Sequence, residues 1–188
     1  MTRTAVSLLA VGLVLSGSAA VAQHGDHAGH AAAGGHAGHL QASVRNPQGQ
    51  AVGEIDARRQ GNVVKVRLTV RGFNAGTYGV HLHQTGRCDA PDFTSAGPHW
   101  NPSERQHGRL NPQGPHLGDL PNLEVRANGT GRIDFDVPVP AGAAADANPL
   151  ADADGTSIII HATADDERTD PSGNSGARIA CGVLTQVR

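Results

Sequence analysis

Two histidines, His81 and His83, stand one residue apart in the sequence YGVHLH, which covers residues 78–83. In a β-strand, alternate residues point to the same face about 6 to 7 Å apart, so both imidazoles would share one face. Val80 and Leu82 would then face the core. Two imidazoles on one face of a rigid strand can bind one metal ion, because each nitrogen lies about 2 Å from it. The pair therefore predicts a metal site.

The loop after this strand offers more ligands. Residues 95–119 are rich in Gly and Pro and carry few apolar side chains, so no core pattern orders them. A loop of this length is normally either functional or disordered. Its candidate ligands are His99, His107, His116 and Asp119. Three neutral imidazoles and one carboxylate form a closed tetrahedral set that suits zinc. A bound ion would order this loop; the alternative is a solvated loop with scattered histidines.

A further histidine and an arginine follow in the last third of the chain. His161 lies in a buried-looking segment that begins at Ser157, where a histidine taken alone would be a hydrogen-bonded core residue. Arg178 begins the final apolar segment. Together with the pair in residues 78–83, these two residues complete a second set of groups suited to chemistry at a metal.

Near the N-terminus, residues 23–39 form a low-complexity stretch of Gly, Ala and His. Its histidines are His24, His27, His30, His36 and His39. This composition cannot build a core, so we expect a disordered tail with weak, adaptable sites for copper, zinc or nickel. A simple flexible spacer is the alternative.

The first 22 residues have the features of a secretory signal peptide. Arg3 provides the charged start, an apolar run extends from Ala5 to Leu15, and small residues at 20–22 form a cleavage signal before Gln23. The apolar run is shorter than the roughly 20 residues that a membrane-spanning helix needs. We therefore expect an exported protein, in the periplasm, the cell envelope or the medium, with no membrane attachment after cleavage.

Length and composition limit the remaining chain to one domain, which is rich in small residues. With 188 residues, 38% of them hydrophobic, and a formal net charge of -2, the chain can bury one core and has no basic excess for nucleic acid. Aromatic residues make up 3% and Gly numbers 25, which favours a turn-rich all-β protein.

Strand and turn signals alternate from Leu40 onward. In residues 62–71, apolar side chains at 64, 66, 68 and 70 alternate with Lys, Arg and Thr, which indicates a strand with one buried face. The expected strands are 41–45, 51–58, 62–71, the segment of His81 and His83, 123–127, 132–137, 157–163 and 178–187. We therefore expect an antiparallel β-barrel or β-sandwich of seven or eight strands.

The chain has only two cysteines, Cys88 and Cys181. In the oxidising compartment that export implies, we expect them to form a disulfide. Closing a loop of this length would contribute roughly 4 to 5 kcal/mol in the chain-entropy model. Two free thiols are the alternative.

Taken together, these motifs resemble the copper/zinc superoxide dismutases, in particular exported bacterial members with a His-rich N-terminal extension. The motifs are GVHLH (79–83), SAGPHWNP (95–102), HG (107–108), HLGDL (116–120), IIH (159–161) with the Asp pair at 165–166, and GARIACGV (176–183). The resemblance covers residues 40–188. It implies a Greek-key antiparallel β-barrel or sandwich of about eight strands with long metal-binding loops.

The resemblance also implies one copper and one zinc per chain. The copper ligands would be His81, His83, His99 and His161. The zinc ligands would be His99, which bridges both ions, with His107, His116 and Asp119. Asp165 would orient one ligand of each ion through its outer nitrogen. Arg178 would attract the substrate beside the copper, and Cys88 and Cys181 would form the structural disulfide.

The activity that the resemblance implies is the dismutation of superoxide to dioxygen and hydrogen peroxide. Copper would alternate between two oxidation states, His99 would carry a proton, and zinc would shape the loop. The loop 164–177 is shorter than in animal relatives, and its charges do not match their guiding residues. A copper-binding or copper-delivery protein of the same fold is the alternative function. A homodimer is compatible with the resemblance, which leaves the oligomeric state open.

Overall fold

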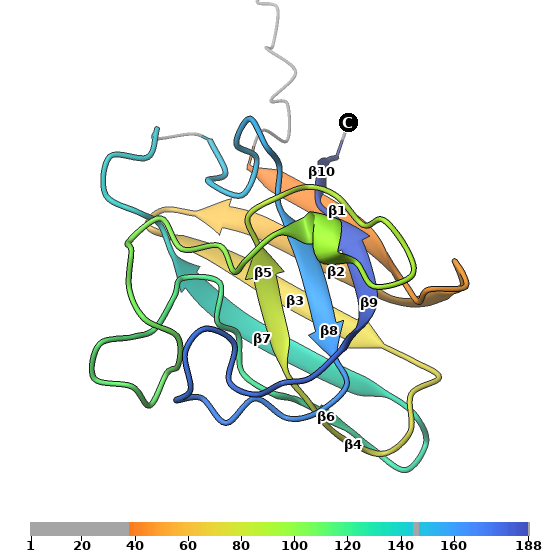
Figure 1. Cartoon of the computed structure of the whole chain (residues 1–188). Helices are drawn as coiled ribbons and strands as arrows, with labels where there is room; N and C mark the ends of the chain where they lie inside the picture. Colours follow the sequence, from red (N-terminus) through yellow and green to blue (C-terminus); the bar gives the residue numbers. More distant parts are fainter. Residues whose placement is uncertain (1–37, 145–146, 188) are drawn as a thin grey trace, which may run out of the picture. The chain divides into compact units, whose positions relative to one another are not determined.

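The computed structural model describes residues 38–144 and 147–187 (Figure 1). The expected signal peptide (1–22) and the tail histidines His24, His27, His30 and His36 lie outside the described residues. Within them, one 10-stranded sheet carries the architecture. Its strands are β1 (His39–Arg45), β2 (Ala51–Gln60), β3 (Val63–Val70), β4 (Gly76–Tyr78), β5 (Val80–His83), β6 (Leu123–Val125), β7 (Gly131–Pro138), β8 (Ser157–His161), β9 (Arg178–Val183) and β10 (Thr185–Gln186). A 3₁₀ turn, η1 (Thr94–Ala96), interrupts the loop after β5.

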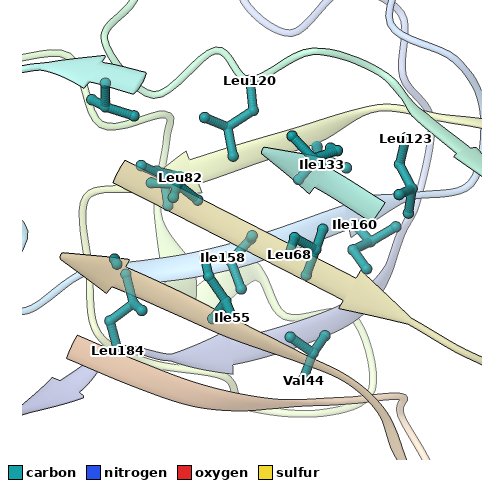
Figure 2. Close-up of a cluster of buried hydrophobic side chains, with 14 of the residues drawn as sticks. Val44, Ile55, Leu68, Leu82, Leu120, Leu123, Ile133, Ile158, Ile160 and Leu184 are labelled. Atoms are coloured by element: carbon teal, nitrogen blue, oxygen red, sulfur yellow. The ribbon is translucent and has the colours of Figure 1, made fainter. Parts of the chain in front are cut away.

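Strand β3 shows how the sequence pattern sets the inner face of the sheet. Its alternate residues Val64, Val66, Leu68 and Val70 are buried, whereas the polar residues between them are exposed. Leu68 pairs in register with Ile55 on β2 and Ile133 on β7, so three apolar side chains from neighbouring strands meet in one row. Figure 2 shows these side chains packed with Leu82 and Ile158 from the opposite side of the core. The expected inward face of this strand is confirmed.

The sheet rolls up because both of its ends belong to one short segment of chain. The strand order runs β4-β6-β7-β3-β2-β1-β9-β8-β5, yet β4 and β5 are separated in sequence only by Gly79. The peptide of Gly79 donates its N–H to the Thr163 carbonyl and accepts the N–H of His161. The described chain thus forms a nearly closed antiparallel β-barrel with Greek-key connections, which confirms the expected fold class. In Figure 1, β5, β8 and β9 form the layer in front of β2, β3 and β7.

Strand β5 is buried on both faces, which distinguishes it from β3. Val80 and Leu82 enter the apolar core, and His81 and His83 are buried on the other face. One edge of β5 pairs with β8. Along its other edge runs the loop of residues 97–120, where Leu82 donates its N–H to Gly118 and accepts that of Trp100. Isolated bridges join His81 to Asp119 and His83 to His99. The backbone therefore brings the loop histidines to the strand histidines.

Apart from shifts of one or two residues at strand ends, three features differ from the sequence predictions. His39, which we placed in the disordered tail, is the first residue of β1 and is buried, with its Nε2 2.5 Å from Asp56 Oδ2. Residues 76–78 form a separate strand, β4, which the expected strands lack, because they pair with β6. The last expected strand is divided into β9 and β10, since β10 pairs with β1. Pairing partners far along the chain decide all three, and local sequence does not show them.

Cys88 and Cys181 form a disulfide, as expected, with their Cα atoms 5.7 Å apart. It ties the loop after β5 to β9. Phe93 and Ala96 of this loop pack with Ile159 and Cys181 in a small apolar cluster beside the main core. Within the described chain, no helix is long and apolar enough to cross a membrane.

Candidate metal centre

Four histidines from β5, β8 and the loop converge on one buried point. His81 and His83 come from β5, His161 ends β8, and His99 lies in the loop along the free edge of β5. One ring nitrogen of each lies within 4.8 Å of the others. In the described part of the chain, the buried atoms His81 Nδ1, His83 Nε2, His99 Nε2 and His161 Nε2 have no hydrogen-bond partner. Burying four lone pairs without partners is costly, so this donor set fits a metal ion.

A second set of four donor atoms lies next to the first. Asp119 Oδ1 is 3.0 Å from His99 Nδ1, 3.1 Å from His107 Nδ1 and 3.2 Å from His116 Nδ1. The Nδ1 atoms of His99 and His116 are 3.3 Å apart. Four donors placed tetrahedrally about 2 Å from an ion are separated by roughly 3.3 Å, which follows from the usual zinc–nitrogen distance. This set therefore has the chemistry and the spacing for zinc.

His99 belongs to both sets. Its Nδ1 faces Asp119, and its Nε2 belongs to the first group. One imidazole can therefore join the two ions. His81 also lies within 4.8 Å of part of the second set. Its Nε2 is occupied by Asp165, however, and its Nδ1 belongs to the first group, so His116 is the better fourth donor.

Asp165 connects the two sets through the outer nitrogens of one histidine from each. Its Oδ2 is 2.8 Å from His81 Nε2 and its Oδ1 is 3.0 Å from His107 Nε2. Both contacts are buried and use the nitrogen that faces away from the donor set. A carboxylate on the outer nitrogen fixes the tautomer and orientation of a metal-binding histidine. A Cβ on Gly173 would lie 1.7 Å from Asp165 Oδ1, so only glycine leaves room for this carboxylate.

The electrostatics favour neutral imidazoles in the first set. Burial lowers the pKa of His81 to about 3 and the pKa of His161 to about 4. Burial also lowers the pKa values of His83 and His99. Their lone pairs are therefore available to a metal ion at neutral pH, because a protonated nitrogen cannot bind one.

The second set contains the strongest charge pairing. Burial opposes ionisation of Asp119, but hydrogen bonds from His107, His116 and His99 hold its pKa well below its usual range. Burial likewise tends to lower the pKa of His107, yet hydrogen bonds to Asp119 and Asp165 raise it to about 9. Metal-free His107 therefore carries a proton on each ring nitrogen at neutral pH, and a cation bound at Nδ1 would displace one of them.

Arg178 stands at the start of β9, next to the first set. It pairs in register with His161, and its guanidinium donates to the Phe93 carbonyl (2.9 Å) and the Gly97 carbonyl (2.8 Å). Gly97 O also faces His83 Nδ1 at 2.8 Å. Burial lowers the pKa of Arg178, although the nearby charge of Asp92 opposes this shift. A partly buried cation held by two carbonyls beside the histidines can attract a small anion.

The structure thus brings together every residue of the expected copper and zinc sets, with Asp165 and Arg178 beside them. His39 lies apart from the centre, paired with Asp56. Sequence reasoning missed the carbonyls that hold Arg178. It also missed Asp170, whose Oδ1 accepts the His107 N–H. Backbone acceptors carry no sequence signal, and an aspartate in a polar loop looks like any solvated charge.

A Greek-key β-barrel with two adjacent donor sets that share one imidazole defines a binuclear metalloprotein with a redox-capable nitrogen site and a zinc-type site. The model of the family "copper/zinc superoxide dismutase (SODC)" matches residues 51–184. The chain therefore belongs to the copper/zinc superoxide dismutase family, oxidoreductases that use copper and zinc.

Individual relatives agree with this assignment. Superoxide dismutase [Cu-Zn] 1 of Aquifex aeolicus is 37% identical over 144 residues, which cover 76% of this chain and 85% of that protein. Superoxide dismutase-like protein YojM of Bacillus subtilis is 41% identical over 141 residues, covering 74% of this chain and 72% of that protein. The crystal structure of a SOD-like protein from Bacillus subtilis matches with a TM-score of 0.70 at 39% identity, over 77% of this chain and 97% of that one.

Proposed function

We propose that the chain dismutates superoxide to dioxygen and hydrogen peroxide, with copper held by His81, His83, His99 and His161. One observation carries the assignment: the four buried nitrogens of this set have no partner in the described chain, and a guanidinium lies beside them. The second set, His99, His107, His116 and Asp119, would hold zinc. Bound copper supplies the one-electron chemistry, and zinc, which has no redox chemistry, supplies charge and shape.

The residues of the chain bind and orient the substrate and carry a proton. Two superoxide ions and two protons give one dioxygen and one hydrogen peroxide, so anion binding and proton delivery are both required. Arg178 would bind the anion, because its charge is fixed beside the histidines by Phe93 and Gly97. When its Nε2 is not holding copper, His99 would hold a proton there, while its Nδ1 stays on the side of Asp119. Asp165 keeps His81 and His107 in position through their outer nitrogens.

Residues 1–22 would direct the chain out of the cytoplasm, to the periplasm, cell envelope or medium, as a protein free of the membrane after cleavage. The charged and apolar pattern of the signal supports this proposal, as does the pair of cysteines that forms a disulfide. Residues 23–38 would be a metal-binding tail whose histidines catch scarce copper. Deleting this tail should slow copper loading at limiting copper and leave the loaded enzyme unchanged; equal loading would favour a spacer.

A homodimer is one assembly compatible with the family resemblance, which leaves the oligomeric state open. Its test is the molar mass of the mature protein by light scattering: one chain's mass at all concentrations would contradict it.

A copper-binding or copper-delivery protein is the second candidate function. The His-rich tail favours it. Against it stand the complete nitrogen set and the positioned Arg178.

The deciding experiment measures copper and zinc per chain on the purified mature protein, together with superoxide consumption before and after copper is added. One copper and one zinc with fast, copper-dependent dismutation is the expected result. Bound metal without dismutation would favour the copper-handling function.

A further inference from the structure

The short loop 164–177 has four acidic side chains. Three of them have partners that account for their positions. Asp165 contacts His81 and His107. Asp166 accepts hydrogen bonds from Arg168, Thr169 and Asn174 within its own loop. Glu167 lies 3.6 Å from Arg109 of the facing loop. The fourth, Asp170, is half-exposed and lies against the zinc-type set.

Asp170 contacts two residues of that set through one oxygen. Its Oδ1 accepts the backbone N–H of His107 at 2.6 Å and lies 3.9 Å from Nε2 of His116. The second separation is within ion-pair range and longer than a direct hydrogen bond. Because Nδ1 of His116 faces Asp119, Nε2 is its outer nitrogen.

The three imidazoles of this set differ in the partner of their second nitrogen. That of His99 belongs to the copper set, and that of His107 meets Asp165. Without Asp170, the outer nitrogen of His116 would have neither a metal set nor a carboxylate beside it among the described residues. Metal-binding histidines usually donate their other N–H to a carboxylate, a carbonyl or water, and loss of that partner commonly weakens metal binding about 10- to 100-fold.

The surrounding backbone brings the two loops into contact at this point. Leu110 donates its N–H to the Glu167 carbonyl at 2.9 Å. A Cβ on Gly108 would lie 2.3 Å from the same carbonyl oxygen, so a glycine is needed for the close approach. Asp170 is thus held near His107 and His116 by a fixed contact between loops.

We propose that Asp170 is a positioning residue of the zinc site, which fixes the peptide of His107 and provides a negative charge for the outer nitrogen of His116. The loop 164–177 then retains zinc through Asp165 and Asp170. This inference rests on the proposed function, because it assumes that zinc binds His99, His107, His116 and Asp119.

The test compares two variants of the full-length mature enzyme. Asp170→Asn keeps an oxygen acceptor for the His107 N–H but removes the charge, and Asp170→Ala removes both. Asp136→Asn is the matched control, since it removes an equal charge from an exposed residue of β7 that pairs with Lys65. Zinc release from protein loaded with both metals is followed with a coloured chelator, and cobalt(II) in the zinc site reports its geometry by visible absorption.

Asp170→Asn should release zinc roughly 10-fold faster and shift the cobalt band, and Asp170→Ala should release it faster still, whereas the control should match the parent. Parent-like zinc release and cobalt bands in both Asp170 variants would overturn the proposal. A change in Asp170→Ala alone would overturn the contribution of its charge to His116. A parent protein that takes up no zinc would contradict the proposed function instead, which separates the two failures.

Discussion

Strands β3 and β5 are both buried, but for different reasons. On β3, apolar residues alternate with exposed polar ones, so packing alone specifies the strand. On β5, all four residues are buried, and two are histidines whose inward nitrogens lack partners in the described chain. Burying apolar surface stabilises the fold by about 25 cal/mol per Å², whereas burying unpaired polar atoms costs free energy. Apolar packing on the β3 side therefore stabilises the fold. That stabilisation offsets the cost of burying unpaired metal-donor atoms on the β5 side.

The largest expected effect comes from removing a copper donor. His161→Ala should reduce copper-dependent superoxide consumption to background while zinc remains bound, because His161 lies outside the zinc set. The measurement is activity with metal analysis of the same sample. His39→Ala is the matched control, as His39 is also a buried histidine but pairs with Asp56 away from the centre. Full activity in the His161 variant would contradict the copper assignment.

The second prediction concerns the disulfide, which joins the loop after β5 to β9. Its cysteines are 93 residues apart, so a Cys88→Ala/Cys181→Ala variant should lose roughly 4 to 5 kcal/mol of unfolding free energy, mainly by loosening the unfolded state. Urea denaturation checks this value. The parent protein under reducing conditions provides a control without a substitution. An unchanged urea midpoint would show that the disulfide does not stabilise the protein by restricting the unfolded chain.

On the β3 side, Leu68→Ala should cost about 2 to 5 kcal/mol of unfolding free energy, because Leu68 is fully buried among Ile55 and Ile133. The metal-free and metal-loaded proteins should lose similar amounts, since this side does not touch the donors. Thr69→Ala, on the exposed face of the same strand, should change little. A loss confined to the metal-loaded form would break the contrast between the two sides.

Arg178→Ala should lower the rate about tenfold and weaken its dependence on salt, because a fixed charge beside the site accelerates the encounter with an anion. Rates measured over a range of ionic strength test this. Arg178→Lys keeps the charge and should recover part of the salt dependence. An unchanged salt response in the alanine variant would remove the steering role.

The last prediction concerns the pH dependence of the metal-free protein. Burial lowers the pKa of His81 to about 3 and of His161 to about 4, against 6.5 for an ordinary histidine. The unfolded chain therefore takes up protons below about pH 6.5 while the folded chain does not. The stability from these groups is present above pH 6.5 and is lost as pH falls toward 4.

Melting temperatures of the metal-free protein at several pH values check this expectation. His107 acts in the opposite sense, since its pKa is raised to about 9 and its contribution is lost as pH rises through that value. A metal-free protein that melts at the same temperature from pH 7 to pH 4 would contradict the expectation.

The sequence correctly predicted the barrel, the inner face of β3 and the disulfide. Alternation of apolar and polar residues is a local signal for strands, and a chain with only two cysteines allows a single pairing. Sequence reasoning also named every donor of both sets: the residues alone indicated the zinc set, and the resemblance added the copper set with Asp165 and Arg178. It missed β4, the division between β9 and β10, and the place of His39 in β1, all of which depend on distant pairing. The role of Asp170 could not be read either, since it depends on how two loops meet.

The loop that covers the second edge of β5 has a consequence for solubility. Residues 97–120 satisfy backbone groups of Val80 and Leu82 that would otherwise be open for pairing with another chain. Exposed strand edges are templates for aggregation. All four zinc-type donors lie within this loop, so bound zinc should keep the loop folded against that edge. Zinc would then protect the protein from self-association as well as shape its catalytic site.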